Sequence, residues 1–122
     1  MKYIRFQDLR PNLGTASKSG IFQLAYDLKY RPFTTSYDDA DLRRQLDWLE
    51  THLDAPEILD KPDHFRAIFW FKDRAHTPLQ CVWTLKRILE AYGYWVDVVK
   101  TGHPGQIIYE DGWQVAAKPQ RK

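Results

Sequence analysis

The chain has 122 residues, of which 43% are hydrophobic and 15% aromatic, and its formal net charge at pH 7 is +2. This length suits one domain with a single core, and so small a charge does not by itself indicate a nucleic-acid partner. The one cysteine, Cys81, excludes an intramolecular disulfide, and no apolar segment approaches the roughly 20 residues that span a bilayer. We therefore expect a soluble, cytoplasmic protein without a membrane partner. One domain should cover residues 1–117, and a flexible basic tail residues 118–122.

The first thirty or so residues predict a strand, a loop and a helix. Residues 3–6 form a short β-prone run, and residues 8–14 are rich in turn formers. Ser19 is suited to cap a helix over residues 20–30, in which apolar residues recur at helical spacing. Pro32 ends that helix, because a proline ring interrupts helical hydrogen bonding.

A second helix is expected to begin at Thr35 and Ser36. The acidic residues of its first turn suit the positive end of the helix dipole. Its core face consists of leucines at helical spacing, namely Leu42, Leu46, Leu49 and Leu53. A polar connection over residues 54–64 then leads to residues 65–71, an aromatic and β-prone run that predicts a buried strand.

The third helix is predicted to start at Thr77 and Pro78, since a hydroxyl cap followed by proline at the first helical position is a common helix start. It runs to about Tyr92, and Gly93 supplies the left-handed residue that often ends a helix. Its inward stripe consists of Cys81, Val82, Leu85, Ile88, Leu89 and Tyr92.

Three short strands follow, over residues 94–100, 106–110 and 113–117. The elements together predict an α+β fold in a single domain, in the order β-α-α-β-α-β-β-β. We expect the last three strands to form an antiparallel meander packed against the helices. The first strand and residues 65–71 can join either edge of that sheet.

The last two strands carry a clear hairpin signal. Asp111 and Gly112 suit a two-residue turn that needs positive φ angles. This register pairs Ile108 with Val115, on the face expected against the helices. Tyr109 then points away from the helices and joins the candidate binding surface.

Two tryptophans lie away from the apolar faces of their own helices. Helical periodicity places Trp48 and Trp83 about half a turn from the centre of those faces, and Leu79 shares the side of Trp83. One interpretation is that Trp83 is buried between the sheet and another helix. The other is an exposed aromatic anchor, because tryptophan is enriched at interface hot spots. Trp48, on a strongly charged helix, is expected to be the more exposed of the two.

Residues 100–105 combine Lys100, a hydroxyl, His103 and two glycines in a loop between strands. Such a loop can bring backbone N–H groups and an imidazole to a phosphate. Over residues 79–117, the order of helix, glycine-ended turn, strand, Gly-His loop and hairpin is similar to that of small RNA-cleaving toxins of the HicA type. The resemblance implies a catalytic role for His103, although Pro104 follows it here, where those toxins carry Gly-Ser-His. A plain turn with an idle histidine is the alternative.

The aromatic run at residues 65–71 ends in Lys72 and Arg74, which can hold phosphates beside stacked bases. A buried strand that leads into a charged loop is the alternative interpretation. The acidic residues between 38 and 63 do not follow the spacing of a calcium loop, and the four histidines are scattered along a chain that has a single cysteine. We therefore predict no metal site and no cofactor.

We predict a small non-enzymatic binding protein of a bacterial or phage accessory kind, in the manner of an inhibitor. It would dock on a protein or other macromolecular partner, or on a second copy of itself, through surface aromatics. The candidate binding residues are Trp48, Trp83, Leu79, Tyr109, Lys72 and Arg74. The alternative is an RNA-binding or RNA-cleaving protein in which His103 acts as acid or base and Lys100, Lys72 and Arg74 hold phosphate.

Overall fold

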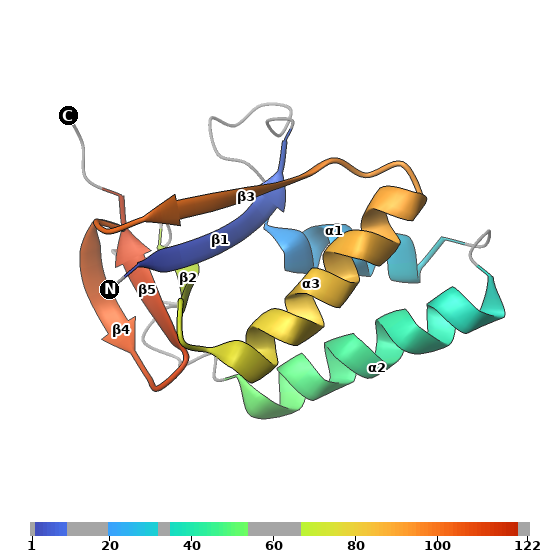
Figure 1. The fold of residues 1–122 in the computed structure, drawn as a ribbon, viewed down its shortest axis with the longest axis horizontal. Helices are drawn as coiled ribbons and strands as arrows, with labels where there is room; N and C mark the ends of the chain where they lie inside the picture. Colours follow the sequence, from blue (N-terminus) through green and yellow to red (C-terminus); the bar gives the residue numbers. More distant parts are fainter. Residues whose placement is uncertain (1, 10–19, 32–34, 54–66, 120–122) are drawn as a thin grey trace.

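The structure, a computed structural model, describes residues 2–9, 20–31, 35–53 and 67–119. It contains the predicted order β-α-α-β-α-β-β-β, and the α+β class is confirmed (Figure 1). The elements are β1 (Tyr3–Asp8), α1 (Ile21–Lys29), α2 (Ser36–His52), β2 (Ile68–Lys72), α3 (His76–Ala91), β3 (Val96–Thr101), β4 (Gln106–Glu110) and β5 (Gln114–Lys118).

The five strands form one antiparallel sheet, but their order differs from the predicted meander. The order is β3-β1-β2-β5-β4, so β4 and β5 are neighbours while β3 lies at the opposite edge, against β1. β1 and β2 occupy the middle of the sheet rather than an edge. The prediction failed because strand periodicity indicates which residues form strands, whereas pairing depends on burial between segments far apart in the sequence.

The sheet consists of two halves that meet at a corner. β1 pairs with β2 only at Tyr3–Lys72 and Ile4–Phe71, whereas it pairs with β3 along its whole length. In Figure 1, β1 and β3 run across the view, and β4 and β5 run steeply to them. Residues 102–105 join the two edge strands. In a flat sheet these edges would be about 19 Å apart, and the link reaches only about 18 Å, so the sheet must curl.

The Arg5 side chain donates a hydrogen bond to the backbone of β2 at the point where β1 no longer pairs with it. The Asp73 N–H donates to the Lys2 carbonyl at 3.1 Å in the paired stretch. Backbone groups of a strand alternate in direction, so the Phe69 carbonyl also faces the side that β1 has left. Arg5 Nη1 donates a hydrogen bond to that oxygen at 3.4 Å. A long-range side-chain contact thus takes the place of a missing ladder bond.

The helices pack against one another and against the sheet face that carries Ile4, Phe6 and Phe71. α2 begins as predicted, because Thr35 Oγ1 accepts a hydrogen bond from the Asp38 N–H at 3.1 Å. α3 begins at His76 without a side-chain cap, so the predicted cap at Thr77 is wrong. The helices contribute to the hydrophobic core Ile21, Leu24, Ala25, Leu28, Leu42, Leu46, Leu49, Leu79, Val82, Leu85, Ile88 and Leu89.

The end of α3 follows the predicted glycine motif. Gly93 has a φ of 90°, the left-handed conformation that glycine tolerates best. The Tyr94 N–H donates to the Leu89 carbonyl at 3.1 Å, and the Gly93 N–H donates to the Glu90 carbonyl at 3.3 Å. This pair of bonds defines a Schellman motif. It turns the chain so that Tyr94 enters the core before β3 begins.

The β4–β5 turn is wider than the predicted two-residue turn. Glu110 pairs with Val115, and Gly112 does not have a positive φ. Instead, Asp111 Oδ1 accepts hydrogen bonds from the backbone N–H groups of residues 113 and 114, at 2.8 and 3.0 Å. An aspartate that binds its own backbone in this way favours an Asx turn over the mirror-image turn that we predicted.

This register also reverses the predicted faces of the hairpin. Gln114 lies opposite Phe71, a core residue, and Tyr109 lies opposite Ala116 after a bulge. Side chains of paired residues point to the same face, so Tyr109 lies on the face that continues from Phe71. Val115, which we expected there, lies on the other face.

Several predicted features lie outside the described residues: the Ser19 cap, the loop at residues 10–14, the connection over residues 54–64 and the tail residues 120–122. Lys118 is the last residue of β5, so this part of the predicted tail belongs to the sheet. None of the helices in the described ranges is long and apolar enough to cross a membrane.

Candidate aromatic interface

Trp83 lies on α3 with nearly half of its surface in solvent. Its ring meets the Phe6 ring edge-on, with the centroids 4.8 Å apart and the planes at 86°. The residue is 47% exposed. Another side of α3 is already buried through Leu85 and Leu89, so the packing of the helix does not depend on this ring. Trp83 is therefore an exposed aromatic on a helix that the core holds in place.

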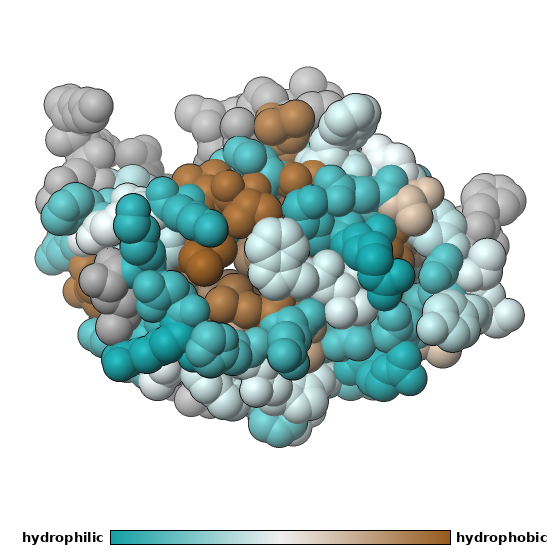
Figure 2. All heavy atoms as spheres, viewed as in Figure 1, coloured by the Kyte–Doolittle hydropathy of each residue, from teal (hydrophilic) through white to brown (hydrophobic). Residues whose placement is uncertain are grey.

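The surroundings of Trp83 are apolar. Phe6 pairs with Val98 of β3, so both side chains lie on one face of the sheet, and Val98 is only half-buried. Figure 2 shows apolar atoms gathered over β1 and β3, with polar side chains around them. Lys86 Nζ lies 5.9 Å from the centroid of the Trp83 ring. We refer to Phe6, Trp83 and Val98 as the Trp83 face.

Trp48 lies in a different environment, and the prediction that it is the more exposed tryptophan is wrong. It is half-buried. Its ring stacks on His52 with the centroids 4.1 Å apart and lies 5.6 Å from the ring of Trp113. The wide β4–β5 turn brings Trp113 to the end of α2, a long-range contact that helical periodicity cannot indicate.

Three other predicted binding residues are occupied within the chain. Leu79 is buried in the core. The Tyr109 hydroxyl donates to Asp111 Oδ2 at 2.7 Å. Lys72 is 4% exposed, and its Nζ lies 2.6 Å from Glu110 Oε2. Leu79 and Lys72 are therefore not part of an exposed surface, whereas Tyr109 keeps part of its surface in solvent.

The candidate phosphate-binding residues Arg74, Lys100 and His103 are exposed. Tyr3 pairs with the last residue of β2 on one side and the last residue of β3 on the other. The segments that carry Arg74 and Lys100 therefore leave the sheet on either side of the start of β1. The His103 N–H donates to Thr101 Oγ1 at 3.1 Å, which fixes the backbone of this loop.

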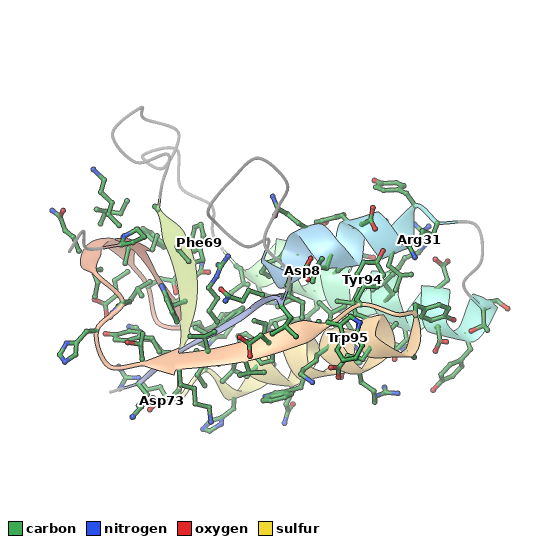
Figure 3. The ribbon with its side chains drawn as sticks, turned by 90° about the horizontal axis from the view of Figure 1, so that it is seen from above. Asp8, Arg31, Phe69, Asp73, Tyr94 and Trp95 are labelled. Atoms are coloured by element: carbon green, nitrogen blue, oxygen red, sulfur yellow. The ribbon has the colours of Figure 1, made fainter. Side chains whose placement is uncertain are left out.

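Among the described residues, the three most exposed aromatic side chains were not predicted as binding residues. Tyr30 is 75%, Tyr37 77% and Trp95 62% exposed. Strand alternation could have indicated Trp95, because it follows Tyr94 and must point the other way. Figure 3 shows Tyr94 and Trp95 in the same part of the molecule as Arg31.

Tyr94 anchors the start of β3 to α1. Its hydroxyl donates to an Asp27 carboxylate oxygen, and the guanidinium of Arg31 lies 4.9 Å from the ring centroid. Burial, assisted by the hydrogen bond to Asp27, raises the pKa of Tyr94 to about 12. The hydroxyl therefore stays protonated and keeps donating to α1 through the neutral pH range.

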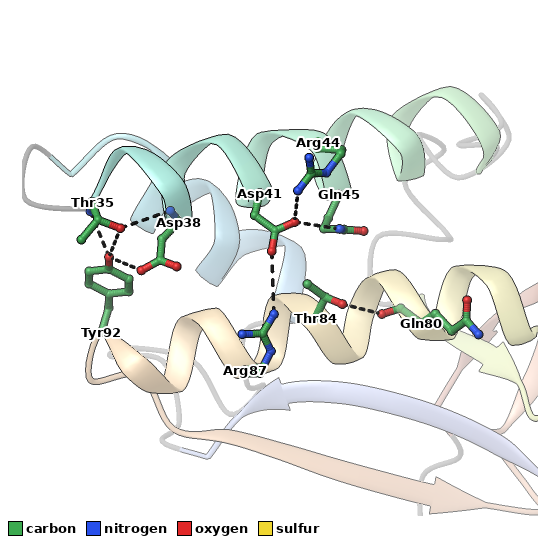
Figure 4. A network of polar contacts seen from close by, with 9 residues as sticks. All are labelled: Thr35, Asp38, Asp41, Arg44, Gln45, Gln80, Thr84, Arg87 and Tyr92. Atoms are coloured by element: carbon green, nitrogen blue, oxygen red, sulfur yellow. Dashed lines mark hydrogen bonds and ion pairs between the residues drawn. The ribbon is translucent and has the colours of Figure 1, made fainter.

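A polar network fixes α2 to α3 (Figure 4). Asp41 is buried, and its Oδ1 accepts hydrogen bonds from Arg44 at 2.7 Å and Gln45 at 3.1 Å. The hydrogen bond from Arg44 is the main cause of the lowered pKa of Asp41. Arg87 of α3 approaches the second carboxylate oxygen, and the Tyr92 hydroxyl donates to the first turn of α2 at 2.6 Å. The contacts of Arg44 and Gln45 order α2 itself, and those of Arg87 and Tyr92 join α3 to α2, so we assign the network a structural role.

Within the described ranges, no group of three or more histidine, cysteine, aspartate or glutamate side chains could hold a metal ion. Comparison of the chain with known protein families, curated proteins and solved structures finds no match. A proposal about function therefore depends on the surface that the fold presents.

Proposed function

We propose that this chain is a binding protein that docks on a macromolecular partner through the Trp83 face. The observation that supports it is the 47% exposure of Trp83 on a helix whose other side is buried. Burial of the exposed half of a tryptophan side chain would contribute a favourable free energy on the order of 2 kcal/mol to the binding of a partner. An apolar centre with a polar border is also the usual arrangement of an interface hot spot.

The ring is held in place before a partner arrives. Phe6, which is buried, meets it edge-on at 4.8 Å. A side chain that is already ordered loses little rotamer freedom on binding, so more of the contact energy contributes to affinity. A small accessory or inhibitor protein of a bacterium or phage, acting in the cytoplasm, would use such a surface to cover part of its partner.

The test compares Trp83→Ala with Trp95→Ala. Both tryptophans are exposed, but Trp95 lies on the opposite face of the sheet from Val98, so it is the matched control. Partners captured from a lysate of the source organism are quantified, and self-association is measured by analytical ultracentrifugation. We expect Trp83→Ala to weaken the captured complex at least about tenfold, because loss of a hot-spot ring costs about 2 kcal/mol. Binding that survives Trp83→Ala and fails in Trp95→Ala would exclude this face.

RNA binding is the second candidate, favoured by one observation. The segments that carry Arg74 and Lys100 leave the sheet on either side of β1, and His103 follows Lys100 in an exposed loop. A steep fall of RNA affinity with added salt, reduced in the double variant Arg74→Gln/Lys100→Gln, would support it. RNA cleavage that disappears in His103→Ala would replace the docking proposal with an enzymatic one.

A further inference from the structure

β3 presents an open backbone edge. The Leu9 N–H donates to the Trp95 carbonyl at 2.9 Å, and the antiparallel register between β1 and β3 continues from this bond without interruption. Backbone groups alternate in direction along such a strand. The residues that face β1 are Asp97, Val99 and Thr101, and those that direct their N–H and C=O groups outward are Val96, Val98 and Lys100.

Nothing in the described part of the chain bonds to these outward groups. The other edge of the sheet differs, because a bulge interrupts β4 between Ile107 and Tyr109. Bulges are a common device that blocks pairing at an edge. β3 has neither a bulge nor a proline over its length, and Val98 and Lys100 both reach solvent.

We propose that β3 receives an extended segment of a partner protein, which adds to the sheet as an antiparallel strand. Strand addition supplies backbone hydrogen bonds, and neighbouring side chains supply specificity. Val98 lies on the same sheet face as Phe6, against which the exposed ring of Trp83 packs. Alternate side chains of the added strand would extend this face beside Val98. The inference rests on the proposed docking function and names the form of its partner.

The charges of β3 define the chemistry of that segment. Asp97 and Lys100 flank two valines and lie on opposite faces of the strand. Opposite charges on directly paired residues are stabilising, and like charges are destabilising. In antiparallel pairing, the residue opposite Lys100 comes first along the added strand. The segment therefore carries an acidic residue, two apolar residues and then a basic residue.

A second copy of β3 has this same order of residues, but hydrogen bonding does not allow it to pair in the charge-matched register. The favourable register would place Asp97 of one copy opposite Lys100 of the other. In an antiparallel pair, the backbone N–H and C=O groups of two directly opposed residues must both point toward the other strand or both point away from it. Asp97 faces its own β1, whereas Lys100 faces outward, so the two cannot pair. A charge-matched segment must therefore be a stretch of polypeptide other than β3, with its backbone free on that side.

The test uses two synthetic peptides and the full-length protein labelled with ¹⁵N. The first peptide is acetyl-Thr-Glu-Val-Val-Lys-Thr-amide, and the matched control has its Glu and Lys exchanged. We expect the first peptide at saturation to slow hydrogen exchange of the Val98 and Lys100 amides at least about tenfold. The Val99 amide, which already faces β1, should change little. The control peptide should bind about fivefold more weakly, because it places like charges opposite both Asp97 and Lys100.

Two variants complete the design. Val98→Pro removes the outward N–H of residue 98 and leaves the hydrogen bonds between β3 and β1 in place. In this variant the first peptide should no longer slow exchange of the Lys100 amide. Asp97→Lys/Lys100→Asp should reverse the preference, so that the control peptide binds better. Val98→Thr, which keeps the N–H, is the control for Val98→Pro and should still respond to the first peptide.

Two results would overturn the addition of a partner strand: no slowing by either peptide at about 5 mM, and slowing caused by raised protein concentration alone, which would indicate a second copy. Equal slowing by both peptides would instead overturn the charge pattern that we assign to the segment. Separate results test the docking function itself. If Trp83→Ala loses the captured partner while Val98→Pro keeps it, the partner docks on the Trp83 face without adding a strand. If Trp83→Ala keeps the partner, the docking proposal itself is wrong.

Discussion

Asp41 in α2 and Arg87 in α3 lie 3.8 Å apart, between a carboxylate oxygen and a guanidinium nitrogen. The carboxylate is buried, whereas the arginine remains largely exposed. Asp41 also accepts hydrogen bonds from Arg44 and Gln45 of its own helix. One acidic side chain thus orders a turn of α2 and ties that turn to α3.

Replacement of Asp41 by asparagine should destabilise the fold in a pH-dependent way. The pKa of Asp41 is lowered in the folded chain, mainly by the hydrogen bond from Arg44. Its contribution is therefore present above the unfolded pKa of about 4 and is lost as the pH falls through the lower folded value. At pH 7 we expect Asp41→Asn to reduce the free energy of unfolding by about 1 kcal/mol, measured by urea denaturation.

The control for this variant is Asp47→Asn, an exposed position on the same helix. It should change the free energy of unfolding by less than about 0.5 kcal/mol. The difference between the two variants should shrink as the pH falls below about 4. A difference that stays constant with pH would show that the charge of Asp41 does not stabilise the fold.

Gly105 should be intolerant of alanine, unlike its loop neighbour Gly102. Gly105 has a φ of 117°, and an added Cβ would lie 2.1 Å from the carbonyl oxygen of Lys118. We expect Gly105→Ala to cost at least about 2 kcal/mol in urea denaturation, from backbone strain and this clash. A Cβ on Gly102 meets nothing within 4 Å, so Gly102→Ala should stay within about 0.5 kcal/mol of the parent. Equal losses in the two variants would contradict the close β4–β5 approach.

The buried Lys72 and its partner Glu110 should respond unequally to mutation. Lys72 is 4% exposed, whereas Glu110 is about half exposed. Glu110→Gln leaves a buried ammonium without its counter-charge and should cost about 2 kcal/mol. Lys72→Met removes the buried charge and keeps the shape, so it should be neutral or stabilising in thermal denaturation. A larger loss in Lys72→Met than in Glu110→Gln would indicate that the ion pair itself stabilises the sheet.

Trp48 should matter more for stability than Trp95. The ring of Trp48 packs between His52 and Trp113, whereas Trp95 is 62% exposed. Trp48→Ala should lower the free energy of unfolding by about 2–3 kcal/mol, and Trp95→Ala by less than about 1 kcal/mol. Urea denaturation followed by far-UV circular dichroism distinguishes the two without depending on tryptophan fluorescence. The reverse ranking would mean that the contact of Trp48 with the β4–β5 turn is not formed.

The helices could be predicted from the sequence because their signals are local. Thr35 caps α2 and Gly93 ends α3 as expected, and three of the four predicted leucines of α2 are fully buried. The predicted start of α3 was wrong, because Thr77 and Pro78 fit a cap motif that the chain does not use. A cap motif indicates a region of the chain rather than a single residue.

The sheet and the candidate interface depend on long-range contacts, and there the sequence is less informative. Asp111 fits either a mirror-image turn or an Asx turn, and only the observed register distinguishes them. A helical wheel shows which side of its own helix Trp48 occupies, but not that Trp113 arrives there from the hairpin. Exposure of Trp83 likewise depends on what the sheet leaves uncovered.

β1 is the strand that joins β3 to the rest of the sheet, and its pairing partners come late in the chain. Tyr3 pairs with Lys72 and with Thr101. On the ribosome, β1 emerges before β3, and residues 9–95 are synthesised between them. Such non-local pairing slows folding, because the long intervening segment must close before the contact forms. The two halves of the sheet can therefore come together only after β3 itself has been synthesised.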